Sequence, residues 1–136
     1  MEMEFTYKNK EEINGLYIHD STFMGFSYDY SQRKTTFVCD NICHKTKFYF
    51  EFNNTLLCYF QSCSFWHGGN CILDVSVEEE TPQMNELKAL QEQKGALYQG
   101  SYLDKGIFYL QIKFTLNSGD TFLIVCEKVY FREETY

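Results

Sequence analysis

The sequence predicts a mainly β protein: an antiparallel β-sandwich or rolled sheet of about eight strands with one short α-helix near 82–94, in a single domain spanning 1–136. Between Phe108 and Leu116 every second residue is apolar and the residues between them are polar, which is the pattern of a strand with one buried face. Aromatic residues make up 18% of the chain, and large rings favour pleated sheets. Turn signals recur roughly every 10–14 residues, a spacing typical of sandwiches and rolled sheets.

The first half of the chain predicts five strands, at 4–8, 24–30, 35–39, 47–52 and 56–62. In the fourth of these, Phe48, Phe50 and Phe52 alternate with polar residues. Burying each ring contributes roughly 1.5–3 kcal/mol, so we expect this strand at the centre of a sheet. Asn53 and Asn54 signal a turn, because Asn tolerates left-handed backbone geometry. The strand at 56–62 is apolar with little alternation, so we expect it to be covered on both faces and Cys58 to lie in the core.

The second half predicts further strands at 71–77, 97–103, 107–116 and 121–131, interrupted by the helix. Thr81 is a favourable N-cap residue, and Pro82 suits the first helical position because its missing N–H costs nothing there. Met84, Leu87 and Leu90 recur every three residues and form a narrow apolar stripe. We therefore expect the helix to lie against a sheet and to end near Gly95.

The charge balance argues against two classes of partner. Nineteen acidic residues outweigh twelve basic ones, giving a net charge of −7, and such a surface repels both nucleic acid and anionic membranes. The acidity fits either a basic protein partner or solubility alone. No apolar run approaches the ~20 residues of a membrane span, and the acidic start is unlike a secretory signal. We therefore expect a cytoplasmic protein, a monomer or a homodimer, with reduced cysteines.

Cysteines and histidines form two candidate metal-binding sets. Cys63, His67 and Cys71 have the spacing C-x3-H-x3-C, and Cys39, Cys43 and His44 follow the pattern C-x3-C-H. Thiolate and imidazole are the ligands that zinc prefers, but neither spacing matches the usual knuckle on a tight turn. Cys39 and Cys71 also fall on strand patterns that point toward the core. We therefore expect buried thiols and exposed loop histidines, and no metal or other cofactor.

His19 and Asp20 form the first candidate binding pair. An unperturbed histidine side chain titrates near neutral pH, and an aspartate could orient His19 for acid–base chemistry. Adjacent residues of an extended chain point apart, however. The interpretation that we favour is a turn in which Asp20 or Ser21 binds nearby backbone N–H groups.

The segment Phe65-Trp66-His67 is the second candidate for binding, and it precedes two glycines at the end of a predicted strand. Trp in an exposed loop is enriched at binding hot spots because it offers a large rigid contact. The alternative is that Trp66 plugs one end of the sandwich. No nucleophile, phosphate-binding or metalloprotease motif is present, so no catalytic residue is assigned.

The stretch Tyr17–Phe23, the Tyr28-Asp29 step and the stretch Phe50–Thr55 together resemble a group of small, uncharacterised bacterial β-rich proteins, some of immunity-protein-like type. Thr55 stands where that group has a valine. The resemblance implies a bacterial cytoplasmic binding protein and assigns no catalytic residue. We expect a non-enzymatic protein-interaction domain. Two alternatives stay open: a small-ligand binder with an aromatic-lined pocket, and a metal-dependent hydrolase that uses the His/Cys clusters.

Overall fold

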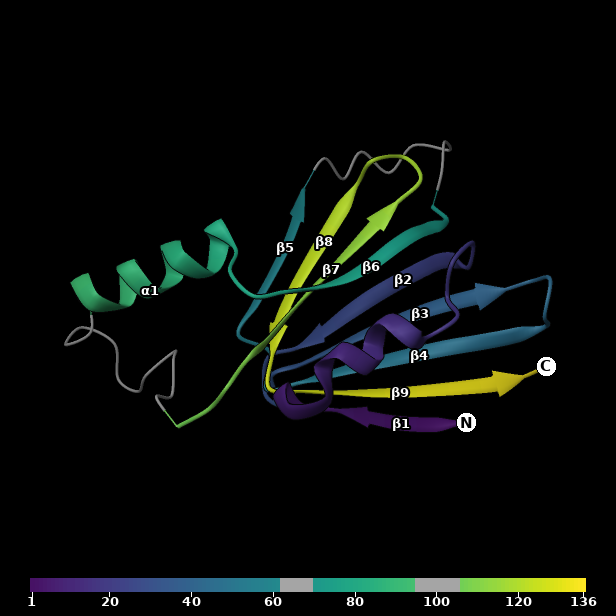
Figure 1. Ribbon diagram of the computed structural model, residues 1–136, viewed down its shortest axis with the longest axis horizontal. Coiled ribbons are helices and arrows are strands. Elements are labelled where there is room, and N and C mark those ends of the chain that lie inside the picture. Colours follow the sequence, from purple (N-terminus) through teal and green to yellow (C-terminus); the bar gives the residue numbers. More distant parts are fainter. Residues whose placement is uncertain (62–69, 95–105) are drawn as a thin grey trace.

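The computed structural model describes residues 1–61, 70–94 and 106–136, and its strands form two antiparallel sheets (Figure 1). The larger sheet has the order β1 (Glu2–Phe5), β9 (Lys128–Thr135), β4 (Thr46–Asn53), β3 (Lys34–Asn41) and β2 (Thr22–Asp29). The smaller sheet has the order β5 (Leu57–Gln61), β8 (Thr121–Cys126), β7 (Leu110–Leu116) and β6 (Ile72–Glu78). The predicted mainly β, sandwich-like class is confirmed. The predicted strand at 97–103 lies outside the described residues.

The two sheets meet at one corner, where the chain passes twice from one sheet to the other at adjacent positions. β4 continues into β5 and β8 continues into β9, and the crossing is held by backbone bonds from the Glu127 N–H to the Asn53 oxygen (3.1 Å) and from the Leu56 N–H to the Val125 oxygen (2.7 Å). Asn54 has a φ of 50°, as its turn signal predicts. The single strand predicted at 121–131 is wrong, because the chain bends at Glu127 and its two halves pair in different sheets.

The sheets diverge from this corner toward an open end, where both chain termini lie (Figure 1). The 3₁₀ helix η1 (Tyr7–Gly15) contacts β1 and β6 and so bridges one edge of each sheet. The first strand ends at Phe5 rather than near residue 8, because η1 begins at Tyr7. Residues 16–21 then cross the open end, and the Asp20 N–H donates to the Ile72 oxygen at 2.8 Å.

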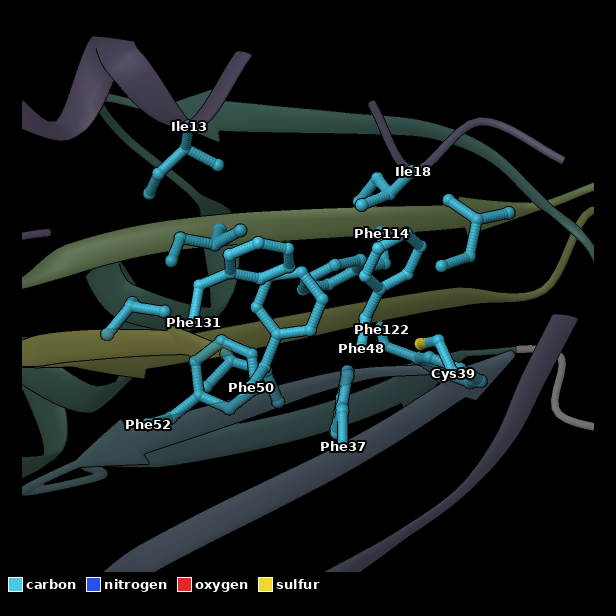
Figure 2. Close-up of a cluster of buried hydrophobic side chains, with 14 of the residues drawn as sticks. Ile13, Ile18, Phe37, Cys39, Phe48, Phe50, Phe52, Phe114, Phe122 and Phe131 are labelled. Carbon is cyan, nitrogen blue, oxygen red and sulfur yellow. The ribbon is translucent and has the colours of Figure 1, made fainter. Parts of the chain in front are cut away.

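Packed phenyl rings fill the space between the sheets (Figure 2). β4 lies in the middle of the larger sheet and buries Phe48, Phe50 and Phe52, so its predicted central position is confirmed. Phe37 on β3 is fully buried and contacts rings from both sheets, including Phe52 at 5.0 Å and Phe114 at 5.3 Å between centroids. The space that the small-ligand alternative would need for an aromatic-lined pocket is therefore occupied by the protein's own side chains along this core.

Two expectations about side-chain exposure are wrong, one because of where a strand lies in its sheet and one because of where a strand begins. β5 is an edge strand, so its residues are half-buried or exposed and Cys58 is not a core residue. Its sulfur lies 3.3 Å from Thr35 Oγ1. β7 begins at Leu110 rather than at 107, so Phe108 precedes the sheet and is 71% exposed. The remaining apolar residues of that alternating pattern, from Leu110 to Leu116, are buried as predicted.

The predicted helix is α1 (Pro82–Lys94), and its capping is confirmed. Thr81 Oγ1 accepts the Met84 N–H at 3.2 Å and donates to Gln111 Oε1 on β7 at 2.8 Å. Met84 packs with Leu123 and Val125 on the outer face of the smaller sheet. The helix then runs away from the sheet (Figure 1), and Leu90 is 38% exposed, so only the beginning of the helix lies against the sheet.

Candidate functional site

His19 and Asp20 come together, contrary to the expectation that they point apart. His19 Nε2 lies 3.4 Å from Asp20 Oδ1, because Asp20 adopts a left-handed conformation with a φ of 65° and folds its side chain back. The imidazole Nδ1 donates a hydrogen bond to the Leu73 carbonyl at 2.8 Å. The two side chains are 55% and 81% exposed, so water screens the pair. The pair is a solvated surface contact and does not form an enclosed acid–base site.

The turn around this pair is built from backbone bonds rather than from the side-chain caps that we expected. The Ser21 N–H donates to the Ile18 oxygen at 3.1 Å, and the Asp20 N–H donates to β6. The Ser21 side chain is fully buried, and its Oγ accepts Asn41 Nδ2 at 3.5 Å. Ser21 thus connects the segment that crosses the open end with the end of β3.

Phe65, Trp66 and His67 lie outside the described residues, as does Cys63, so their proposed binding role stays a prediction. The residues on either side are placed. Gln61 ends the edge strand β5. Asn70 is joined to β2 by two bonds, since its oxygen accepts the Phe23 N–H at 2.7 Å and its Nδ2 donates to the Phe23 oxygen at 3.1 Å.

The thiols separate into buried and accessible groups. Cys39 and Cys126 are fully buried as expected, and burial raises the pKa of the Cys39 thiol to about 12. Cys43 is exposed and Cys71 is half-buried. Within the described ranges no group of three or more His, Cys, Asp or Glu side chains could hold a metal ion, so Cys39, Cys43 and His44 are not gathered into the candidate set. The set of Cys63, His67 and Cys71 extends beyond those ranges.

The first candidate surface is a row of exposed apolar side chains along β2 and directly after its end, which we call the edge surface: Met24, Phe26, Tyr28 and Tyr30. These side chains are between 37% and 87% exposed. β2 is the last strand of its sheet and pairs with β3. At its start Thr22 forms an isolated bridge with Cys71 and Phe23 bonds to Asn70, so among the described residues the open edge begins after Phe23. A bulge between Phe23 and Gly25 shifts the register, after which Phe26 and Tyr28 pair with the inward-facing Phe37 and Thr35.

Phe26 and Tyr28 therefore belong to the inner face of the larger sheet but lie where the cover of the smaller sheet ends. The Phe26 ring contacts Phe60 of β5 at 4.4 Å, and the Tyr28 ring contacts Tyr30 at 4.8 Å. Burial and the nearby Cys58 raise the pKa of Tyr28. The sequence predicts these aromatic residues as a half-buried strand, but only the strand order shows that the strand is an unpaired edge.

The second candidate is a pocket at the open end, which we call the rim pocket. It measures about 310 Å³ and is lined by Met1, Gly15, Leu16, Tyr17, Asn41, His44, Thr46, Phe48, Phe131 and Glu133. β3, β4 and β9 supply its floor, and the segment after η1 supplies one wall. The Tyr17 and His44 rings meet edge to face at 5.6 Å across that wall.

The floor of the rim pocket holds polar groups at positions where a strand normally buries apolar ones. Asn41 and Thr46 are each 6% exposed and pair directly across β3 and β4. Asn41 Oδ1 accepts the His44 N–H at 3.2 Å. The hydroxyl of Thr46 is buried and is the one buried side-chain polar atom of the described residues without a hydrogen-bond partner.

Sequence reasoning missed these pocket residues, although the signal for them was present. The alternation that places Phe37 and Cys39 inside continues to Asn41, and the alternation of β4 begins at Thr46. A polar residue on the inward register of a strand indicates either a bonded core group or the lining of a site. The sequence alone could not show that these strand ends meet beneath Tyr17.

Comparison with known proteins shows no family: no family model matches the chain, and no curated protein does. No helix in the described ranges is long and apolar enough to cross a membrane. The functional proposals below therefore depend on the side chains and strand edges of this chain.

Proposed function

We propose that this protein is a non-enzymatic protein-binding domain, and that its partner lays an extended segment along the free edge of β2. The observation that carries the proposal is that an eight-residue edge strand presents three exposed apolar side chains, followed directly by a fourth at Tyr30. An exposed edge is a template for another strand, because its outward N–H and C=O groups have no partner. Strand addition uses these groups for affinity and the alternate side chains for specificity.

The edge strands of the two sheets differ in how well they are protected against pairing with a strand of another protein. β1 has only four residues, two of which are glutamates, and η1 contacts β6. β5 has five residues. β2 is the longest of the four edge strands and contains no lysine and no proline, the residues that commonly block pairing at an edge. This difference favours β2 as the binding edge.

The partner that we propose is a protein with net positive charge whose binding segment alternates apolar and polar residues. The net charge of −7 attracts such a partner at long range, while the edge surface supplies the short-range contacts. An immunity-type role, in which the chain covers a toxin, is one form of this proposal and draws on the resemblance of the first half. The five described cysteines are free thiols, which supports a cytoplasmic setting.

The test compares two matched lysine substitutions in a pull-down from the source cell's lysate. Met24→Lys places a charge on the edge surface, and Ile42→Lys places the same charge at a similarly exposed apolar residue in the β3–β4 turn. We expect a basic protein to be retained by the wild type and by Ile42→Lys and to be lost from Met24→Lys. Hydrogen exchange of the purified complex should then show slowed amides between Gly25 and Asp29.

Retention of a partner by both variants alike, or unchanged exchange along β2, would refute the edge as the binding site. If the wild type retains no protein, the function itself is refuted. A second copy of the chain bound at the edge would appear as a dimer in sedimentation of the purified protein, and that result would replace the basic partner.

A further inference from the structure

We propose that the rim pocket binds a small organic cation, a protonated amine with a compact apolar body. This inference is independent of the edge surface, because the pocket lies at the open end and shares no residue with it. Its volume of about 310 Å³ falls at the lower end of the range for small-molecule sites.

The shape of the pocket follows from where the phenyl core stops. On β4 the inward positions run from Phe52 through Phe50 and Phe48 to Thr46, and on β9 they run from Val129 through Phe131 to Glu133. Phe48 and Glu133 are direct partners across these two strands. The apolar core therefore ends in a floor with one hydroxyl and one carboxylate, beneath the wall formed by Tyr17 and His44.

The Thr46 hydroxyl needs a partner that the described protein does not provide. Leaving such a group buried and unbonded costs about 1–3 kcal/mol, and an unpaired buried group in a native protein calls for an explanation. Asn41 pairs with Thr46 across the strands, but its side chain already bonds to His44 and Ser21. A ligand that donates a hydrogen bond to Thr46 Oγ1 would remove the cost.

The charge of the ligand follows from Glu133. The three ion pairs among the described residues are Lys10–Glu79, His19–Asp20 and Arg132–Glu134, so the Glu133 carboxylate belongs to none of them. The Met1 ammonium bonds to the Glu133 backbone oxygen at 3.3 Å rather than to this carboxylate. Its side chain is half-buried, so an ion pair here is screened less than one on the open surface. An ammonium group has three N–H donors, so one can pair with the Glu133 carboxylate and another can serve Thr46 once the floor shifts to expose the buried Oγ1.

The walls of the pocket favour the same ligand. Tyr17 presents an exposed ring that can attract a cation through its π-face, and the nearly buried rings of Phe48 and Phe131 form an apolar floor behind it. An anionic ligand would meet the Glu133 carboxylate and the field of a chain with net charge −7. The chemical class is therefore an arylalkyl or alkyl ammonium ion rather than a carboxylate or a phosphate.

The experiment titrates the full chain with benzylammonium, neutral benzyl alcohol and anionic benzoate, and measures binding by calorimetry and by chemical-shift changes. We expect saturable binding of benzylammonium that shifts the resonances of Thr46 and His44. Benzyl alcohol should bind roughly tenfold more weakly, because it lacks the charge, and benzoate should not bind.

Two variants locate the site. Glu133→Gln and Thr46→Val should each weaken benzylammonium binding roughly tenfold, whereas the outward-facing, ion-paired Glu134→Gln should bind like the wild type. Thr46→Val keeps the shape of the side chain and removes the unbonded hydroxyl, so its thermal unfolding should match or exceed that of the wild type. Lack of saturable binding by benzylammonium, equal affinity for benzoate, or unchanged affinity in Glu133→Gln would each overturn the proposal.

Discussion

Replacing Phe37 by Ala removes the side chain that makes the largest number of ring contacts among the described residues. Phe37 is 0% exposed and contacts rings from both sheets and from the edge strand, at centroid distances of 5.0–6.4 Å: Phe23, Phe26, Phe52, Phe114 and Phe122. Because these neighbours are held by two sheets, they cannot close fully over the vacated space. We expect the free energy of unfolding to fall by about 3–5 kcal/mol. This loss is a large share of the roughly 5–15 kcal/mol that stabilises a typical domain.

The assay is urea unfolding followed by far-ultraviolet circular dichroism, together with a thermal scan in which the midpoint should fall by roughly 10–15 °C. Phe108→Ala is the matched control, because it deletes the same side chain at a position that is 71% exposed and contacts only Tyr7 among the described rings. Its cost should stay below about 1 kcal/mol. If Phe37→Ala costs no more than Phe108→Ala, the description of the core as one interlocked set of rings is wrong.

Four further outcomes follow from single contacts. Thr81→Ala removes the cap of α1 and the bond to Gln111, so the free energy of unfolding should fall by about 1–2 kcal/mol, with Thr81→Ser close to the wild type. Hydrogen bonds from Ser31 and from the Gln32 backbone lower the pKa of the Asp29 carboxyl. The ionised carboxylate therefore stabilises the fold above its unfolded-state pKa, and this stabilisation is lost as pH falls through the folded-state pKa. Asp29→Ala should be less stable than the wild type at neutral pH and equally stable in acid, as urea unfolding at the two pH values would show. Alkylation of the native protein at mildly alkaline pH should label Cys43 and leave Cys39 and Cys126 unlabelled until urea is added, as peptide mass mapping would show. Glu79→Gln removes the 2.6 Å ion pair to Lys10, so the free energy of unfolding measured by chemical denaturation should fall by up to about 1 kcal/mol. Adding Lys10→Met to this variant should largely recover the lost stability, which a double-mutant cycle would measure.

The predicted elements that proved correct depend on local chemistry. The two-residue alternation around Phe48, Phe50 and Phe52 predicts a strand and its buried face, because successive side chains of a strand point to opposite sides. Thr81 and Pro82 mark the start of α1 through capping and through a backbone angle that proline already has. Asn54 predicts a turn through its tolerance of a positive φ.

The candidate sites were predicted less well than the strands, because a site depends on residues that are distant in the sequence. His19 and Asp20 were recognised as neighbours, but their approach to 3.4 Å required the left-handed turn at Asp20. The aromatic residues of β2 were recognised as strand residues without a role. Asn41, Thr46 and Glu133 carry no motif, and they share a pocket only because β3, β4 and β9 pair in one register.

By itself, the sequence determined the class of the protein, most of its strands, its short helix, its acidity and its aromatic core, since each depends on composition or on periods of two to four residues. Only the tertiary structure decided that β5 lies at an edge, that the chain changes sheets at Glu127, and that β2 and the rim pocket remain open. The physical reason is that the alternation of apolar and polar residues specifies which face of a strand is buried, but not which strand pairs with it. The packing of the whole chain determines the strand pairing, and the pairing determines the edges and pockets where we propose binding.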